Sequence, residues 1–338
     1  MQVENSKNAQ TSADLSSSLP SGVAKLEHLG VIRVTGADAA SFLQGQLTND
    51  VALLGMNESR LAAFCSAKGR MQASFTIYKR VSADVSQTTP DIYMVCSRDI
   101  LMPTLKRLSM FVMRAKAKLT DATDEFSIYG LTGNAINLIA AQAINTPATA
   151  VFNTSTVIAL HPTLGQSRAL LITPLGTPVA DAAPVGVTLS TELWNWGEVH
   201  AGIATITAPI VEAFVPQMLN YESVGGVNFK KGCYPGQEVV ARSQFRGTLK
   251  RRAYVVQIES SELQPIVGQE VFHDSDAEQP CGTVVQVAKN PATDLSGGYS
   301  AIVSMQVLAS VGGKLTLGSA SGADITLVPL PYPLLEDI

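Results

Sequence analysis

The chain has 338 residues, with 24 lysines and arginines against 28 acidic residues, which gives a net charge of −4 at pH 7. A hydrophobic content of 46% is sufficient for a large core, and this length suggests about two domains. The acidic balance argues against a broad nucleic-acid surface, and no uninterrupted apolar stretch approaches the ~20 residues of a membrane-spanning helix.

Residues 1–22 are rich in Ser, Asn and Gln and lack the apolar stretch of a signal peptide. We therefore expect a disordered tail there. Cysteines occur at four distant positions without a Cys-x-x-Cys pair. This spacing is typical of reduced cytoplasmic thiols and predicts no metal site, neither for zinc nor for a self-contained iron–sulfur cluster.

The region from residue 23 to residue 249 mixes strand and helix patterns, as in an α+β domain. Apolar side chains recur at spacings of three and four, which predicts helices. Ser97 and Ser190 or Thr191 can cap two of them. Helices are expected at 37–48, after Ser97, at 135–144 and at 191–201. Strands are expected at 28–35, 61–66, 71–80, 91–96, 116–120, 126–131, 156–160 and 169–173.

The remaining segment, residues 250–338, consists of short β-rich runs separated by Gly, Pro and Asp turns. Regular short strands with such turns predict a small barrel or sandwich. The boundary between the two domains is placed between residues 249 and 252. Strands are expected at 253–259, 270–273, 282–287, 300–305, 314–317 and 325–330.

Residues 225–252 contain the densest set of unusual residues, with seven of the 24 cationic side chains. Pro235 keeps Cys233 in a loop before a helix that is expected from Gln237 to about Gly247. Nearby cations and the positive end of a helix dipole both favour the thiolate form of a cysteine. Cys233 is therefore predicted to be a functional thiol, and the alternative is a small buried packing residue.

The sequence KKGCYPGQEVVAR at 230–242 closely resembles the KGCYxGQE signature of the YgfZ-type folate-binding proteins, relatives of the glycine-cleavage T-protein, an aminomethyltransferase. FLQGQLTNDV at 42–51, AKGRMQASFTIY at 67–78 and the AGI…PQMLN run at 201–220 match in the same order. The resemblance covers nearly the whole chain after about Leu26. It implies an aminomethyltransferase-like folate-binding domain of two subdomains, with antiparallel sheets and packed helices, followed by a small antiparallel β-barrel.

The resemblance further implies a site for tetrahydrofolate or a derivative. The family has a folate-lining tryptophan at the position of Trp194, whereas Trp196 is expected in the core. Lys68 and Arg70 could meet the anionic tail of a folate. The other residues implied to bind the cofactor are Gln44, Asn49, Lys230, Lys231, Gly232, Tyr234, Gln237 and Arg242.

Two positions depart from the family within this site. A second folate-lining tryptophan is replaced by Leu29, and a glutamate is replaced by His200. A carboxylate accepts two hydrogen bonds in one plane from a pterin, which histidine cannot do. Folate binding therefore requires Glu198 or Glu212 in its place.

A third departure bears on catalysis. Aminomethyltransferases have an Asp-Asp pair where this chain has Ala73 and Ser74, and neither can act as a base near neutral pH. The resemblance thus implies a cytoplasmic accessory protein, without aminomethyl transfer, for the assembly or maintenance of iron–sulfur enzymes, including those that modify tRNA. One alternative is a folate-dependent aminomethyltransferase or demethylase that uses Asp50. Another is a tRNA-binding module that uses the basic residues.

Overall fold

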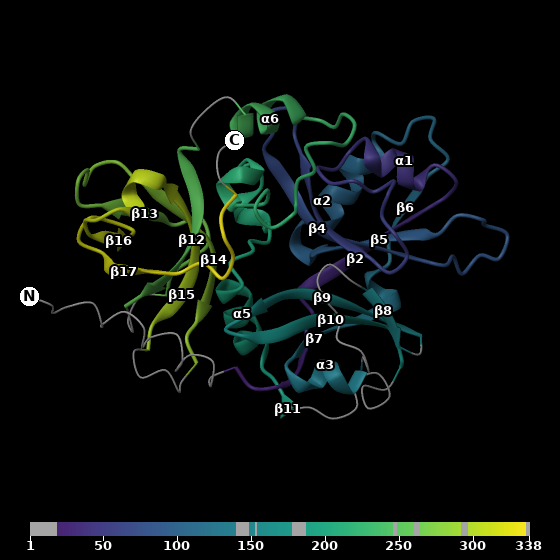
Figure 1. The fold of residues 1–338 in the computed structure, drawn as a ribbon, viewed down its shortest axis with the longest axis horizontal. Helices are drawn as coiled ribbons and strands as arrows, with labels where there is room; N and C mark the ends of the chain where they lie inside the picture. The colour runs from purple at the N-terminus through teal and green to yellow at the C-terminus, as the bar shows by residue number, and fades with distance from the viewer. Residues whose placement is uncertain are drawn as a thin grey trace, which may run out of the picture.

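Three lobes, each built on a β-sheet, surround a central region in the computed structural model (Figure 1). The C-terminal lobe lies on the left of the figure, and the two N-terminal lobes lie on the right, one above the other. The structure describes residues 19–139, 149–152, 154–177, 187–245, 249–259, 264–291 and 297–335.

The first lobe is a five-stranded antiparallel sheet in the order β3-β4-β5-β2-β6. Every residue of β5 is buried, so this central strand is covered on both faces. Two helices belong to the lobe, α1 (Ala39–Gln44) and α2 (Arg98–Ser109). The strands are β2 (Leu29–Thr35), β3 (Ser59–Cys65), β4 (Met71–Arg80), β5 (Asp91–Ser97) and β6 (Lys118–Asp121).

Helix α1 is shorter than predicted. It ends at Gln44, whereas the apolar spacing predicted a helix over 37–48. The side-chain oxygen of Gln44 accepts hydrogen bonds from the backbone N–H groups of Val51 and Ala52, at 2.7 and 3.2 Å. These bonds close a turn, so the chain leaves the helix before Leu47, which packs in the core from the loop.

The second lobe is a six-stranded sheet in the order β11-β1-β7-β10-β9-β8, in which the β1–β11 pair is parallel. Its helix is α3 (Asn134–Ile139), and residues 140–144 of the predicted helix lie outside the described residues. The strands are β1 (Gly22–Lys25), β7 (Phe126–Thr132), β8 (Thr149–Phe152), β9 (Ser155–Thr163), β10 (Gln166–Pro174) and β11 (Val187–Thr188).

Strand β1 begins inside the segment that was predicted to be a disordered tail. Leu19 is buried and belongs to the main core, and the backbone N–H of Gly22 donates to Thr132 Oγ1 at 3.0 Å. The ordered chain therefore begins before Gly22 rather than after it. Residues 1–18 lie outside the described residues.

The third lobe confirms the predicted C-terminal barrel. It is closed and antiparallel, in the order β12-β15-β14-β13-β16-β17, and its first strand begins at Arg251. Its own core includes Val256, Val284 and Val303. The strands are β12 (Arg251–Ile258), β13 (Glu270–His273), β14 (Gly282–Lys289), β15 (Tyr299–Gln306), β16 (Leu315–Leu317) and β17 (Ala323–Val328).

Helix α5 (Thr191–His200) lies in the centre, between the barrel and the second lobe (Figure 1). Ser190 caps it as predicted, because its Oγ accepts from the backbone N–H of Leu193 at 3.2 Å. Helix α6 (Gln237–Phe245) lies at the top of the molecule. Short 3₁₀ helices occur at η2 (Thr123–Glu125), η3 (Ala208–Ile210), η4 (Pro216–Leu219) and η5 (Val307–Ser310). No described helix is both long enough and apolar enough to span a membrane.

Candidate functional site

A cavity of about 770 Å³ lies where the three lobes meet. Strands β4 and β5, strands β9 and β10, helix α5 and the barrel strand β14 all contribute to its lining. This volume is in the range of small-molecule binding sites. Because it is shared by three lobes, the cavity exists only in the complete fold.

The cavity-facing side of α5 presents Trp194, Asn195 and Glu198. His200 does not line the cavity; its Nε2 lies 3.0 Å from Ser300 Oγ of the barrel, and its ring is 4.6 Å from that of Trp196. Trp196 is buried in the main core, as expected. His200, which stands at the position of the family's glutamate, thus contacts the barrel. Glu198 is the carboxylate that α5 presents to the cavity.

Glu212, the other candidate to replace that glutamate, lies away from the cavity lining. Its carboxylate accepts from Gln72 Nε2 and is 3.4 Å from Arg107 Nη1. It therefore cannot meet a ligand in the central cavity.

Arg168 on β10 is a cavity residue that was not predicted from the sequence. It is 3% exposed, its Nη2 forms an ion pair with Glu198 Oε1, and its guanidinium lies 4.5 Å from the centroid of the Trp194 ring. Burial lowers the pKa of Arg168 to about 9, so the group is still charged at pH 7. No sequence motif marks Arg168, which meets Glu198 only through the folded arrangement of β10 and α5.

The predicted role of Trp194 as a stacking surface stays a prediction, and the geometry restricts it. The backbone of Gly130 packs so closely against the ring that an added Cβ would lie 2.4 Å from it, and Arg168 covers the ring as well. Only 1% of the Trp194 surface is exposed. The face of the Trp194 ring is therefore not open to stacking by a ligand in this structure.

His161, also in the cavity lining, provides a pH-dependent prediction. Burial, and secondly the charge of Arg168, lower its pKa from 6.5. The unfolded chain then binds a proton more tightly than the folded protein, so this contribution to stability is present above about pH 6.5 and lost as the pH falls. We expect the decrease in Tm between pH 7.5 and 5 to be smaller for His161→Gln than for the wild type. Parallel slopes in thermal unfolding would contradict this assignment.

Asn49 lines the cavity, but its amide is engaged by the protein. Its Nδ2 donates to the carbonyl oxygens of Leu61 and Gly225, both at 2.7 Å, and its Oδ1 accepts from the Asp50 N–H at 2.8 Å. Gln44, the other predicted ligand from this segment, does not line the cavity and closes the turn after α1. The structure thus supports packing and turn roles for both side chains.

The loop at 230–236, which begins the signature sequence and is called the signature loop below, lies apart from the cavity lining. Gly232 and Cys233 are exposed, whereas Tyr234 is buried. None of the predicted ligands Lys230, Lys231, Gly232, Tyr234, Gln237 and Arg242 lines the cavity, and neither does Cys233.

The ammonium group of Lys231 points to carbonyl groups. It donates to the oxygens of Gln44 and Leu47 and lies 4.8 Å from the centroid of the Tyr234 ring. Burial lowers the pKa of Lys231 to about 8, and the charges of Asp50 and Cys233 oppose this shift. Lys231 therefore fastens the loop after α1 to the signature loop, which contains Cys233.

Cys233 differs from the other three cysteines, all of which lie in described parts of the chain. Cys65, Cys96 and Cys281 are buried, and burial raises the pKa of both Cys65 and Cys96 to about 12. Each pKa unit above the working pH lowers the thiolate fraction about tenfold. We expect a maleimide to label one thiol of the native protein at least ~100-fold faster than the others, and Cys233→Ser to abolish that phase. Rapid labelling that persists in Cys233→Ser would contradict the prediction.

No group of three His, Cys, Asp or Glu side chains that could hold a metal ion occurs in the described part of the chain.

Comparison with known proteins first defines the class of fold. No family model matches the sequence. The structure is similar to the glycine cleavage system aminomethyltransferase T from Bartonella henselae, with a TM-score of 0.66 and 17% identity over 94% of this chain and 88% of that one. The predicted aminomethyltransferase-like fold is therefore confirmed.

The sequence is similar to proteins of one name. It is 29% identical to the tRNA-modifying protein YgfZ of Photorhabdus laumondii over 330 residues, which are 95% of each chain. It is also 29% identical to the tRNA-modifying protein YgfZ of Colwellia psychrerythraea, over 93% of this chain and 94% of that one. The predicted resemblance to the YgfZ-type proteins is confirmed over nearly the whole chain.

Proposed function

We propose that the central cavity binds tetrahydrofolate or a derivative. In this proposal the protein is a cytoplasmic accessory factor for iron–sulfur enzymes, including enzymes that modify tRNA, and those enzymes are its partners. The observation that supports it best is the three-lobed cavity, in which Glu198 supplies the carboxylate that His200 cannot. Similarity to proteins named for tRNA modification supports the second part, and four free thiols suit a reducing compartment.

The residues of the cavity fit the two ends of a folate. Glu198 can accept hydrogen bonds from the donors of the pterin, and Leu160 and Leu170 form an apolar part of the cavity wall. The anionic glutamate tail requires a cation, for which Arg60 in the lining is the candidate. Lys68 and Arg70, which were expected to meet the tail, do not line the cavity, and Arg70 donates to the carbonyl of Ala213.

We propose binding without aminomethyl transfer, because the carboxylate that the transferase alternative requires is already engaged. Ala73 is buried in the core, and Ser74 Oγ accepts from the Ile206 N–H at 2.9 Å. Asp50, on which the transferase alternative depends, accepts from the Leu53 N–H and from Gln44 Nε2 and lies 3.7 Å from Arg60. Such a carboxylate is poorly placed to act as a base.

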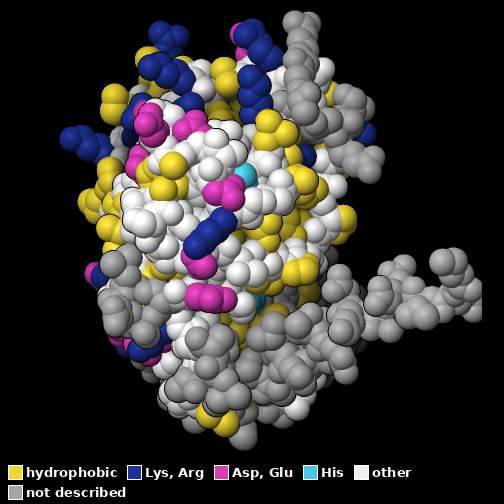
Figure 2. Space-filling view, turned by 90° about the vertical axis from the view of Figure 1, so that its left-hand side faces the viewer, with side chains coloured by type: hydrophobic (Ala, Val, Ile, Leu, Met, Phe, Trp, Pro, Cys, Tyr) yellow, Lys and Arg dark blue, Asp and Glu magenta, His cyan; other side chains and the backbone are white. Residues whose placement is uncertain are grey.

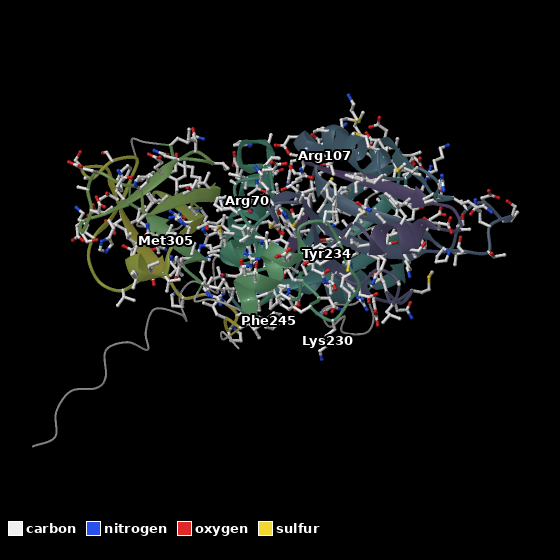
Figure 3. All side chains as sticks on the ribbon, turned by 90° about the horizontal axis from the view of Figure 1, so that it is seen from above. Arg70, Arg107, Lys230, Tyr234, Phe245 and Met305 are labelled. Atoms are coloured by element: carbon white, nitrogen blue, oxygen red, sulfur yellow. The ribbon has the colours of Figure 1, made fainter. Side chains whose placement is uncertain are left out.

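The tRNA-binding alternative would use the upper face of the molecule. Lysine and arginine side chains gather at the upper edge in Figure 2, whereas Arg70 and Lys230 lie well apart from each other when seen from above in Figure 3. RNA affinity at this face would fall steeply with salt concentration, whereas folate affinity would change little.

The test of folate binding uses the two tryptophans. The variant Trp196→Phe retains Trp194 beside the cavity, and its fluorescence should be quenched saturably by tetrahydrofolate and by 5-formyl-tetrahydrofolate. The matched variant Trp194→Phe retains Trp196, which does not line the cavity, and should respond much less. An absence of binding in calorimetry, with the wild type and both folates, would refute the proposed cavity function.

The accessory role is tested separately in a strain that lacks this gene. Wild-type protein should restore the activity of a tRNA-modifying iron–sulfur enzyme, and Cys233→Ser should fail to do so if the exposed thiol acts chemically. Full restoration by Cys233→Ser would leave Cys233 without a chemical role.

A further inference from the structure

Arg168 on β10 is buried and forms an ion pair with Glu198 on α5, whose side chain is 23% exposed. Arg168 is 3% exposed, and its Nε has no hydrogen-bond partner among the described residues. A buried donor without an acceptor typically costs about 1–3 kcal/mol, and such groups in native proteins call for an explanation. Since Arg168 lines the cavity, a bound ligand is the natural source of the missing acceptor.

The surroundings of the pair restrict the chemistry of that ligand. Glu198 balances the charge of Arg168, so a carboxylate or phosphate placed here would be repelled as well as attracted. Ala159, Leu160 and Leu170 contribute apolar side chains to the same lining. The ligand that matches this pair is therefore an uncharged molecule with a polar edge. On that edge a hydrogen-bond acceptor lies directly beside hydrogen-bond donors.

The pterin ring of a folate has such an edge, because its 4-oxo oxygen is adjacent to the N3–H and the 2-amino group. We propose that Arg168 is a specificity-determining residue that donates a hydrogen bond to the 4-oxo oxygen, while Glu198 accepts from N3–H and the 2-amino group. This inference rests on the proposed folate function and adds to it the orientation of the ring. The glutamate tail then extends away from Arg168.

The inference predicts discrimination between folates that differ at one position. A 4-amino group places donors opposite the donors of Arg168 and removes the N3–H that Glu198 requires. A site built to hydrogen-bond a ligand rejects an analogue with the wrong pattern strongly, by up to ~10⁴-fold, because buried polar groups are left unpaired.

The experiment is calorimetry with folic acid and aminopterin, which are identical except for the 4-oxo and 4-amino groups, with tetrahydrofolate as a reference ligand. Wild-type protein should bind folic acid on the order of 100-fold more tightly than aminopterin. Arg168→Met should weaken folic acid binding and bring the two affinities to within a few-fold. Arg60→Met, which changes another arginine of the lining, should leave the ratio unchanged.

The outcomes separate this inference from the proposed function. Binding of folates with equal wild-type affinity for folic acid and aminopterin overturns the role of Arg168 and leaves the folate function in place. A folded Arg168→Met protein with the wild-type ratio of the affinities for folic acid and aminopterin would also overturn the role of Arg168 and leave the folate function in place. Binding of none of the three compounds overturns both. Because Arg168→Met leaves Glu198 without its ion-pair partner, Arg168→Met/Glu198→Gln serves as the second variant. The comparison of folic acid with aminopterin in the wild type does not depend on the folding of either variant.

Discussion

Substitution of Gly236 by valine is expected to lower the free energy of unfolding by about 2–5 kcal/mol. Gly236 has φ +79°, and this left-handed conformation costs a residue with a side chain about 1–2 kcal/mol. An added Cβ would lie 2.4 Å from the carbonyl oxygen of Ser66 and 2.6 Å from the Cα of Gly69. These are backbone atoms of the turn between β3 and β4, so they cannot rotate away, and overpacking adds roughly 1–3 kcal/mol.

The measurement is urea unfolding of Gly236→Val beside Gly232→Val. Gly232 belongs to the same loop, but no atom lies within 4 Å of its added Cβ, and its φ is not in the left-handed region. Its substitution should change stability by no more than about 0.5 kcal/mol. Equal effects of the two substitutions would contradict the close packing of Gly236 against the β3–β4 turn.

The second large effect is expected at the junction between the N-terminal lobes and the barrel. Arg252 Nη1 lies 2.7 Å from Glu222 Oε1, and the two side chains are 9% and 0% exposed. Removal of one partner from a buried ion pair typically costs about 3–5 kcal/mol, because the other charge is left uncompensated. Arg252→Met should therefore destabilise the protein by this amount, as measured by chemical unfolding at pH 7.5.

Two controls isolate the effect of burial. Arg242→Met breaks a pair with Glu238 of similar length, 2.6 Å, but with side chains 64% and 83% exposed, and should cost less than about 1 kcal/mol. The double substitution Glu222→Leu/Arg252→Met should recover much of the lost stability, since it leaves no unpaired charge. A cost for Arg252→Met no greater than that for Arg242→Met would contradict the proposed role of the buried pair.

The pH dependence of the Arg252→Met variant follows from Glu222. Burial raises the pKa of Glu222, and Arg252 opposes that shift. Without Arg252, a group with a raised folded-state pKa loses its contribution to stability as the pH rises through that pKa. The destabilisation should therefore be larger at pH 8 than at pH 5.

The elements of this protein were largely predictable because their signals are local. The six barrel strands were expected within a few residues of their observed bounds, since turn residues and apolar alternation mark each strand separately. The cap of α5 at Ser190 and the strands of the β3–β4 hairpin follow from equally short patterns. The signature at 230–242 indicated the class of fold.

The tertiary structure alone decided which side chains meet in the cavity. Arg168 and Glu198 are 30 positions apart, and their contact requires both the pairing of β10 with β7 and the docking of α5 on the second lobe. The same docking turns Glu198 to the cavity and His200 to the barrel, whereas Cys233, in another segment, lies outside the lining. Periodicity determines which face of an element is buried, but the packing of separate elements determines which residues it is buried against.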